Sequence, residues 1–147
     1  MVPKNKLTLL DQRGALKSYF PDAALSDPSI HHLTFTHWVQ PTPLSIRYQI
    51  HLVHKRGESP KVYVLDPKPL PLHPDRRSLP HVYSHVEQRL CLYDPIEHEW
   101  NADMFHVHTT LPWTVEWLMH YEIWVGTGTW NGGGTNHTSS KSESAAA

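Results

Sequence analysis

The single cysteine of the chain, Cys91, is the residue best suited to covalent chemistry. A thiolate is a strong nucleophile and a good leaving group, so a reachable cysteine can carry an acyl group as a thioester. Leu90 and Leu92 flank it, and a cysteine in such a setting can equally be a small buried hydrophobe. His81 and His85 are close enough in sequence to reach the thiol, and histidine titrates near neutral pH. Both interpretations of Cys91 are open at this point.

The 13 histidines of the chain suggest a second kind of chemistry, metal binding. In "HVH", His106 and His108 would share one face of a strand, a spacing used in some zinc sites. The other histidines are scattered, no second cysteine accompanies them, and no HExxH motif is present. We therefore expect ordinary strand and loop histidines and no dedicated metal site.

Length and composition indicate one compact domain. The chain has 147 residues and a formal net charge of -1, so no basic field indicates nucleic acid as a direct partner. There is no apolar run long enough to cross a bilayer, and the N-terminus lacks the apolar core of a signal peptide. We expect a cytoplasmic protein with no membrane partner, formed by one domain over residues 1–134. The Ser- and Ala-rich residues 135–147 should form a flexible low-complexity tail.

Hydrophobic spacing predicts the elements that must position these residues. Residues 7–20 are expected to form a helix, with Leu7, Leu10 and Leu16 on its apolar face. Period-two alternation predicts three strands that follow one another as an antiparallel meander. Their inward-facing residues are expected to be Leu33, Phe35 and His37, then Ile46, Tyr48, Ile50 and Leu52, then Val62 and Val64.

Two further segments surround the cysteine. Five prolines between residues 67 and 80 predict a stiff loop that is neither helix nor central strand and lies outside the core. After the short apolar segment "RLCLY", the stretch that begins at Leu111 predicts a second helix, with Thr110 as its cap and Gly126 at its end. Its apolar positions are Trp113, Val115, Trp117, Leu118, Met119 and Trp124.

The order of these elements, together with "PHVYSHVEQRLCLYDP", resembles the ubiquitin-conjugating-enzyme (UBC) fold. In that family a His-Pro-Asn element precedes the active-site cysteine by about ten residues, and His81 stands ten positions before Cys91. "RLCLY" matches the family's cysteine context, and Trp100 lies near a tryptophan that the family carries after its cysteine. The resemblance implies an α+β fold with an N-terminal helix, an antiparallel β-meander, a cysteine-bearing loop and a C-terminal Trp-rich helix.

The ending "TLPWTVEWLMHYEIWVGTGTWNGGG" is similar to that of small stand-alone prokaryotic UBC-like proteins. Such proteins occur in the short form of type II cyclic-oligonucleotide anti-phage signalling systems (CBASS), beside a cGAS-like nucleotidyltransferase. The resemblance implies that Cys91 forms a thioester and passes the acyl group to an amine, such as a lysine of a target protein. The expected acyl donor is the C-terminus of the partner cGAS-like nucleotidyltransferase, and no cofactor is implied.

One departure from the family pattern concerns the oxyanion. Tyr83 occupies the position of the family's Asn, and Val82 that of its Pro. The hydrogen-bond donor to the oxyanion could then be His81, the phenol of Tyr83 or backbone amides near Cys91. Asp94 could orient the incoming amine, while Glu99 and Trp100 would pack against the cysteine loop or gate it.

Two other functions are compatible with these residues. The first is a catalytically inactive UBC-like binding module that docks and regulates a partner protein. The second is a cysteine hydrolase, which is less favoured because "QRLCLYDP" does not look like the start of a helix, where cysteine peptidases usually place their nucleophile.

Overall fold

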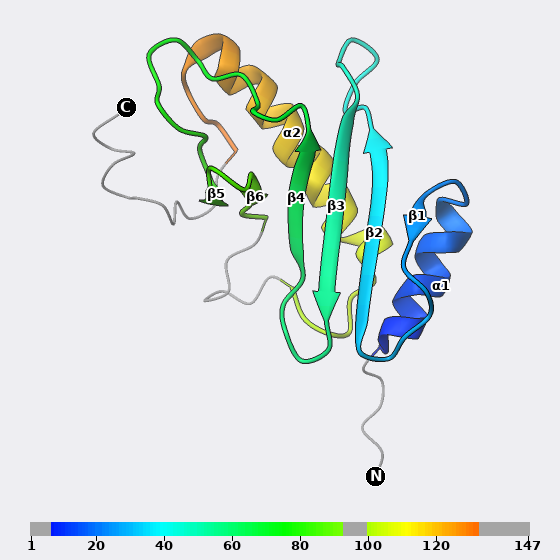
Figure 1. The fold of residues 1–147 in the computed structure, drawn as a ribbon. Coiled ribbons are helices and arrows are strands. Elements are labelled where there is room, and N and C mark those ends of the chain that lie inside the picture. The colour runs from blue at the N-terminus through cyan, green and yellow to red at the C-terminus, as the bar shows by residue number, and fades with distance from the viewer. Residues whose placement is uncertain (1–6, 93–99, 133–147) are drawn as a thin grey trace.

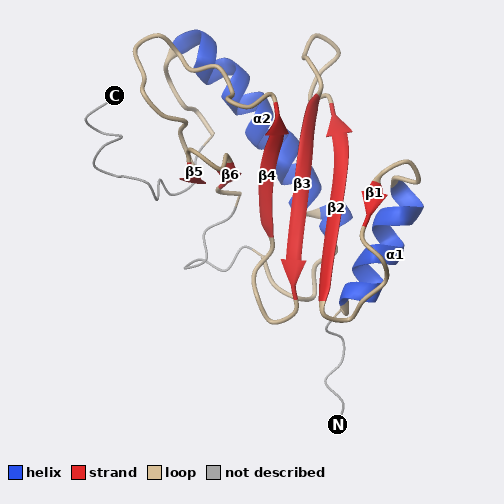
Figure 2. Ribbon diagram, viewed as in Figure 1, coloured by secondary structure: helices blue, strands red, loops and turns tan. Residues whose placement is uncertain are grey.

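The computed structural model describes residues 7–92 and 100–132. It is an α+β fold in which two helices accompany one antiparallel sheet, as predicted (Figure 1, Figure 2). The elements, in chain order, are α1 (Leu9–Tyr19), β1 (Ala24–Leu25), β2 (His32–Val39), β3 (Tyr48–Lys55), β4 (Lys61–Asp66), β5 (Val82–Ser84), β6 (Arg89–Leu90), the 3-10 helix η1 (His106–His108) and α2 (Thr110–Thr127). None of the described helices is long and apolar enough to span a bilayer.

The first helix is confirmed, but its buried face differs from the prediction. Thr8 caps α1 through a capping box, in which its hydroxyl accepts from the Asp11 amide at 3.1 Å and the Asp11 carboxylate accepts from the Thr8 amide at 2.9 Å. Leu16 is buried, whereas Leu10, expected on the same face, is 43% exposed. Leu9 takes the buried position instead. The prediction for Leu10 was wrong because the buried face is formed by Leu9, Gln12 and Leu16, at i, i+3 and i+7, and Leu10 is turned about 100° away from Leu9.

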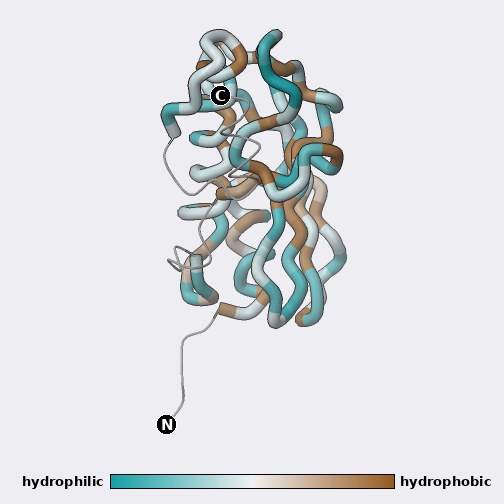
Figure 3. Tube along the Cα trace, turned by 90° about the vertical axis from the view of Figure 1, so that its left-hand side faces the viewer, coloured by the Kyte–Doolittle hydropathy of each residue, from teal (hydrophilic) through white to brown (hydrophobic). Residues whose placement is uncertain are grey.

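The predicted three-strand meander is confirmed and forms the centre of a larger sheet. Its strand order is β1-β2-β3-β4-β6-β5, and every neighbouring pair is antiparallel. Hydrophobic and hydrophilic residues alternate along the strands (Figure 3). The buried residues of the meander are Leu33, Phe35, Tyr48, Ile50, Leu52, Val62 and Val64. Ile46 was expected among them but is 57% exposed, because β3 starts two residues later.

The proline-rich segment between β4 and β5 contains neither helix nor strand, as predicted. It nevertheless belongs to the core, which contradicts the expectation from sequence: Leu70 and Leu79 are 2% and 1% exposed. Proline prevents regular backbone pairing, but it does not prevent the leucines between the prolines from packing inward. The Tyr121 hydroxyl of α2 also donates to the Pro71 carbonyl at 2.6 Å.

The C-terminal helix is confirmed with shifted ends. Thr109 is the residue that precedes α2, and Thr110 lies inside the helix. Gly126 also lies inside, and the helix is closed by Gly128, which has a left-handed φ of 82° and donates its amide to the Trp124 carbonyl. Met119 is 41% exposed and therefore does not face the core as expected. The helix crosses behind β3 and β4, and Trp117, Leu118 and Trp124 are buried (Figure 1).

Candidate functional site

Cys91 directly follows β6, the inner strand of a short hairpin at the edge of the sheet. Val82 of β5 pairs with Leu90 of β6, and both side chains are buried in the core. The Cys91 amide donates to the His81 carbonyl oxygen at 3.1 Å, which extends the pairing by one residue. The cysteine is half-buried. It lies at the end of a strand. It does not lie at the start of a helix, which agrees with the prediction from "QRLCLYDP".

His81 is held in an unusual conformation beside the cysteine. Its φ is 45°, a left-handed value that residues with a Cβ adopt rarely. The side chain is 8% exposed, and its imidazole stacks on the Trp130 indole with 4.9 Å between ring centroids. Its carbonyl oxygen accepts from the indole N–H of Trp117 at 2.9 Å as well as from Cys91. His81 thus joins the hairpin to α2 and to the segment that follows it.

Gln88 anchors the other end of the hairpin, and sequence reasoning missed it. Its side chain is 2% exposed. The amide nitrogen donates to the Val64 and Pro67 carbonyls, both at 3.0 Å, and the amide oxygen accepts from the Leu70 amide at 2.7 Å. These bonds connect the hairpin to β4 and to the proline-rich segment. A glutamine in "VEQRL" looks like an ordinary surface residue, so no sequence signal marks it.

Tyr83 lies on β5, where the register between β5 and β6 shifts. The guanidinium of Arg89 sits over its ring, 4.5 Å from the centroid, in a cation–π arrangement. The Arg89 Nε is buried and has no hydrogen-bond partner within the described part of the chain. Arg89 is a further residue that the sequence did not single out, and it fixes the tyrosine ring on the hairpin.

His85 lies in the turn of the hairpin. Its Nδ1 accepts from the Leu79 amide at 3.1 Å, so this nitrogen contributes to the shape of the turn. The three predicted site residues, Cys91, His81 and Tyr83, thus lie on or directly beside this hairpin, and the described contact between them is the backbone bond from Cys91 to His81. Asp94 and Glu99 lie outside the described residues.

Trp100 contacts a separate cluster of buried histidines. Its indole stacks on His106 at 5.5 Å and meets the edge of His54 at 5.3 Å. His54 Nδ1 and His106 Nε2 are 2.9 Å apart, and the other His106 nitrogen lies 2.7 Å from the Thr110 hydroxyl. Burial lowers the pKa of His106 from 6.5 to about 3, and that of His54 is lowered for the same reason. Both rings are therefore neutral at physiological pH.

This arrangement corrects the expected geometry of "HVH". His106–His108 form a 3-10 helix and not a strand, so His106 is fully buried while His108 is exposed. A strand would have placed both imidazoles on one face, whereas the tighter helical turn separates them. Among the described residues, no three His, Cys, Asp or Glu side chains gather in a group that could hold a metal ion.

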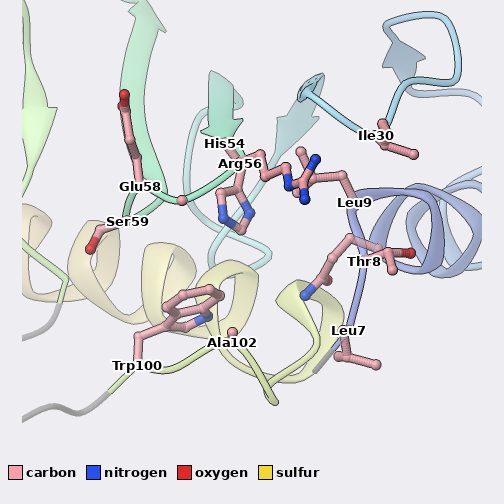
Figure 4. A pocket seen from close by; sticks show the side chains of 12 residues that line it. Leu7, Thr8, Leu9, Ile30, His54, Arg56, Glu58, Ser59, Trp100 and Ala102 are labelled. Atoms are coloured by element: carbon pink, nitrogen blue, oxygen red, sulfur yellow. The ribbon is translucent and has the colours of Figure 1, made fainter. Parts of the chain in front are cut away.

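A pocket of about 690 Å³ opens beside the histidine cluster, between the start of α1, the β3–β4 turn and residues 100–102 (Figure 4). His54 and Trp100 form part of its wall, and Arg56 and Glu58 come from the turn. Cys91 is not among the residues that line it. The cysteine hairpin and this pocket are therefore separate features of the described structure.

Comparison with known proteins identifies the family. Residues 12–138 match the family described as type II CBASS E2 protein. No curated protein matches the chain. The matched region contains the sheet, the cysteine hairpin and α2, and it agrees with the resemblance carried by "LCLY" and "PWTVEWL". The chain therefore belongs to the type II CBASS E2 proteins.

Proposed function

We propose that this protein forms a thioester on Cys91 and transfers the acyl group to an amine during bacterial anti-phage defence. The proposed donor is the C-terminus of a partner cGAS-like nucleotidyltransferase, and the proposed location is the cytoplasm. The observation that carries the proposal is the position of Cys91, half-buried at the end of β6 with its backbone amide bonded to the His81 carbonyl. A nucleophile held by its backbone, with a side chain that is partly accessible, suits a covalent carrier.

The proposed reaction has two acyl-transfer steps. First, the Cys91 thiolate attacks the activated C-terminal carbonyl of the donor, a C–S bond forms, and the activating group leaves with its electron pair. Second, a neutral amine attacks the thioester carbonyl, the tetrahedral oxyanion collapses, and the thiolate leaves while the nitrogen loses a proton. The first step needs an activated donor, supplied either by a separate activating protein or by an unconventional route.

Tyr83 is the side chain that we propose for oxyanion stabilisation. Leu90 faces the core, so strand alternation directs Arg89 and, one residue beyond the strand, Cys91 toward the opposite face. The Tyr83 ring lies under the Arg89 guanidinium, which supports a position on this same face. A preorganised phenol that donates to the oxyanion should contribute about 2–4 kcal/mol to the transfer step.

His81 is proposed to organise the loop. Its ring is buried and stacked on Trp130, and its carbonyl accepts two hydrogen bonds. These contacts make His81 a support for the Cys91 backbone. They favour a structural role for the residue over the role of a general base, whose ring would have to move.

The proposal is tested by loading the protein in the presence of the neighbouring nucleotidyltransferase and activating proteins. Non-reducing gels should show an adduct that is lost on addition of thiol, and Cys91→Ser should give an adduct that resists thiol because it is an oxyester. Cys91→Ala should give none, and preformed thioester of Tyr83→Phe should discharge to an amine about 30-fold or more slowly. Stable association with the partner without any adduct would instead identify a catalytically inactive binding module.

A further inference from the structure

Trp117 is linked to Cys91 through a single atom, the carbonyl oxygen of His81. The indole N–H of Trp117 donates to this oxygen at 2.9 Å, and the Cys91 amide donates to it at 3.1 Å. A carbonyl oxygen has two lone pairs and can accept both bonds. The C-terminal helix and the backbone of the cysteine are therefore attached to the same acceptor.

We propose that Trp117 is a positioning residue for Cys91, which sets the backbone geometry of the cysteine through the His81 carbonyl. Trp117 acts through another residue and not on the reacting atoms. The functional part of this inference rests on the thioester function proposed above.

The indole is itself held firmly on a rigid element. Trp117 is 4% exposed and stacks on Tyr121 with 5.7 Å between centroids and 5° between planes. The Trp130 ring packs against it at 5.5 Å, and the Tyr121 hydroxyl is bonded to the Pro71 carbonyl. A donor fixed by stacking on an α-helix can hold the His81 carbonyl more precisely than a side chain from a loop could.

The conformation of His81 indicates why such a restraint is needed. A left-handed φ of 45° is unfavourable for a residue with a Cβ and persists only where the surroundings enforce it. The Trp117 bond fixes the carbonyl of His81, and the Trp130 stack fixes its ring. Without the indole N–H, His81 can relax toward a commoner conformation, which would turn its carbonyl away and move the Cys91 amide with it.

The test removes the N–H and keeps an aromatic ring. Trp117→Phe is compared with Trp124→Phe, a matched control on the same helix whose ring is 3% exposed and lies against Tyr121. Because Phe is smaller than Trp, a second variant carries β-(3-benzothienyl)alanine at position 117 alone, which replaces the N–H by sulfur with little change of shape. Two quantities are measured: the hydrogen-exchange rate of the Cys91 amide by NMR, and the discharge rate of preformed Cys91 thioester to an excess of amine.

Both position-117 variants should exchange the Cys91 amide about tenfold faster and discharge the thioester about tenfold more slowly, as expected for the loss of one buried hydrogen bond. The Trp124→Phe control should change each rate less than about twofold, because its ring does not bond to the hairpin. Cys91 exchange equal to that of the control would overturn the proposal, as would normal discharge by the benzothienyl variant. A wild-type protein that never forms a thioester would contradict the proposed function, and the exchange rates would still decide whether Trp117 fixes Cys91.

Discussion

Replacement of Gln88 tests most directly how the cysteine hairpin is attached to the fold. Gln88→Ala removes three side-chain hydrogen bonds, to the carbonyls of Val64 and Pro67 and from the amide of Leu70. At about 1 kcal/mol for each bond, the free energy of unfolding should fall by about 3 kcal/mol. Gln88→Glu should cost more at pH 7, because a buried carboxylate would face two carbonyl oxygens.

The measurement is urea unfolding at pH 7, followed by tryptophan fluorescence. Gln40→Ala is the control: this glutamine is exposed and makes one hydrogen bond, to the Ser45 carbonyl, so its loss should change stability by less than about 1 kcal/mol. A Gln88→Ala protein within 1 kcal/mol of the wild type would refute the assigned role of the buried amide, as would a Gln88→Glu protein more stable than Gln88→Ala.

Three further predictions concern His106, Gly128 and His81. The pKa of His106 is lowered by burial to about 3, so below pH 6.5 the unfolded chain takes up a proton that the folded protein does not. The contribution of neutral His106 to the free energy of unfolding is fully present above about pH 6.5 and falls by about 1.4 kcal/mol per pH unit well below it. Between pH 7.5 and 5.0, His106→Gln should therefore lose less stability in urea unfolding than the wild type, and an equal loss would contradict this. Gly128→Ala should lower the melting temperature by several degrees, since an added Cβ would lie 3.1 Å from the His73 ring at a φ of 82°, and an unchanged melting temperature would argue against that strain. His81→Gly should be more stable than His81→Ala by about 1 kcal/mol in urea unfolding because glycine accepts a positive φ freely; the reverse order would be inconsistent with the left-handed backbone.

Local patterns predicted most of the fold. Period-two alternation identified β2, β3 and β4, and helical spacing identified α1 and α2, because each of these elements buries one face in a regular repeat. The errors lie where a shift of one or two residues matters, as at Leu10 and Ile46. The exposure of Ile46 depends on where β3 starts, which strand pairing decides, and that of Leu10 depends on which face of α1 packs against the rest of the chain.

For the candidate site, the sequence singled out Cys91 by its residue type, and the resemblance to the UBC family singled out His81 and Tyr83 by their offsets from it, because type and offset are local properties of the chain. Their support is not local. The bond from Trp117 spans 36 residues, and the bonds of Gln88 reach back to Val64 across 24. Leu70 and Leu79 are buried although the prolines around them predicted a surface loop. Only the tertiary structure could decide these contacts, because they depend on which distant segments pack together, and no short stretch of sequence contains that information.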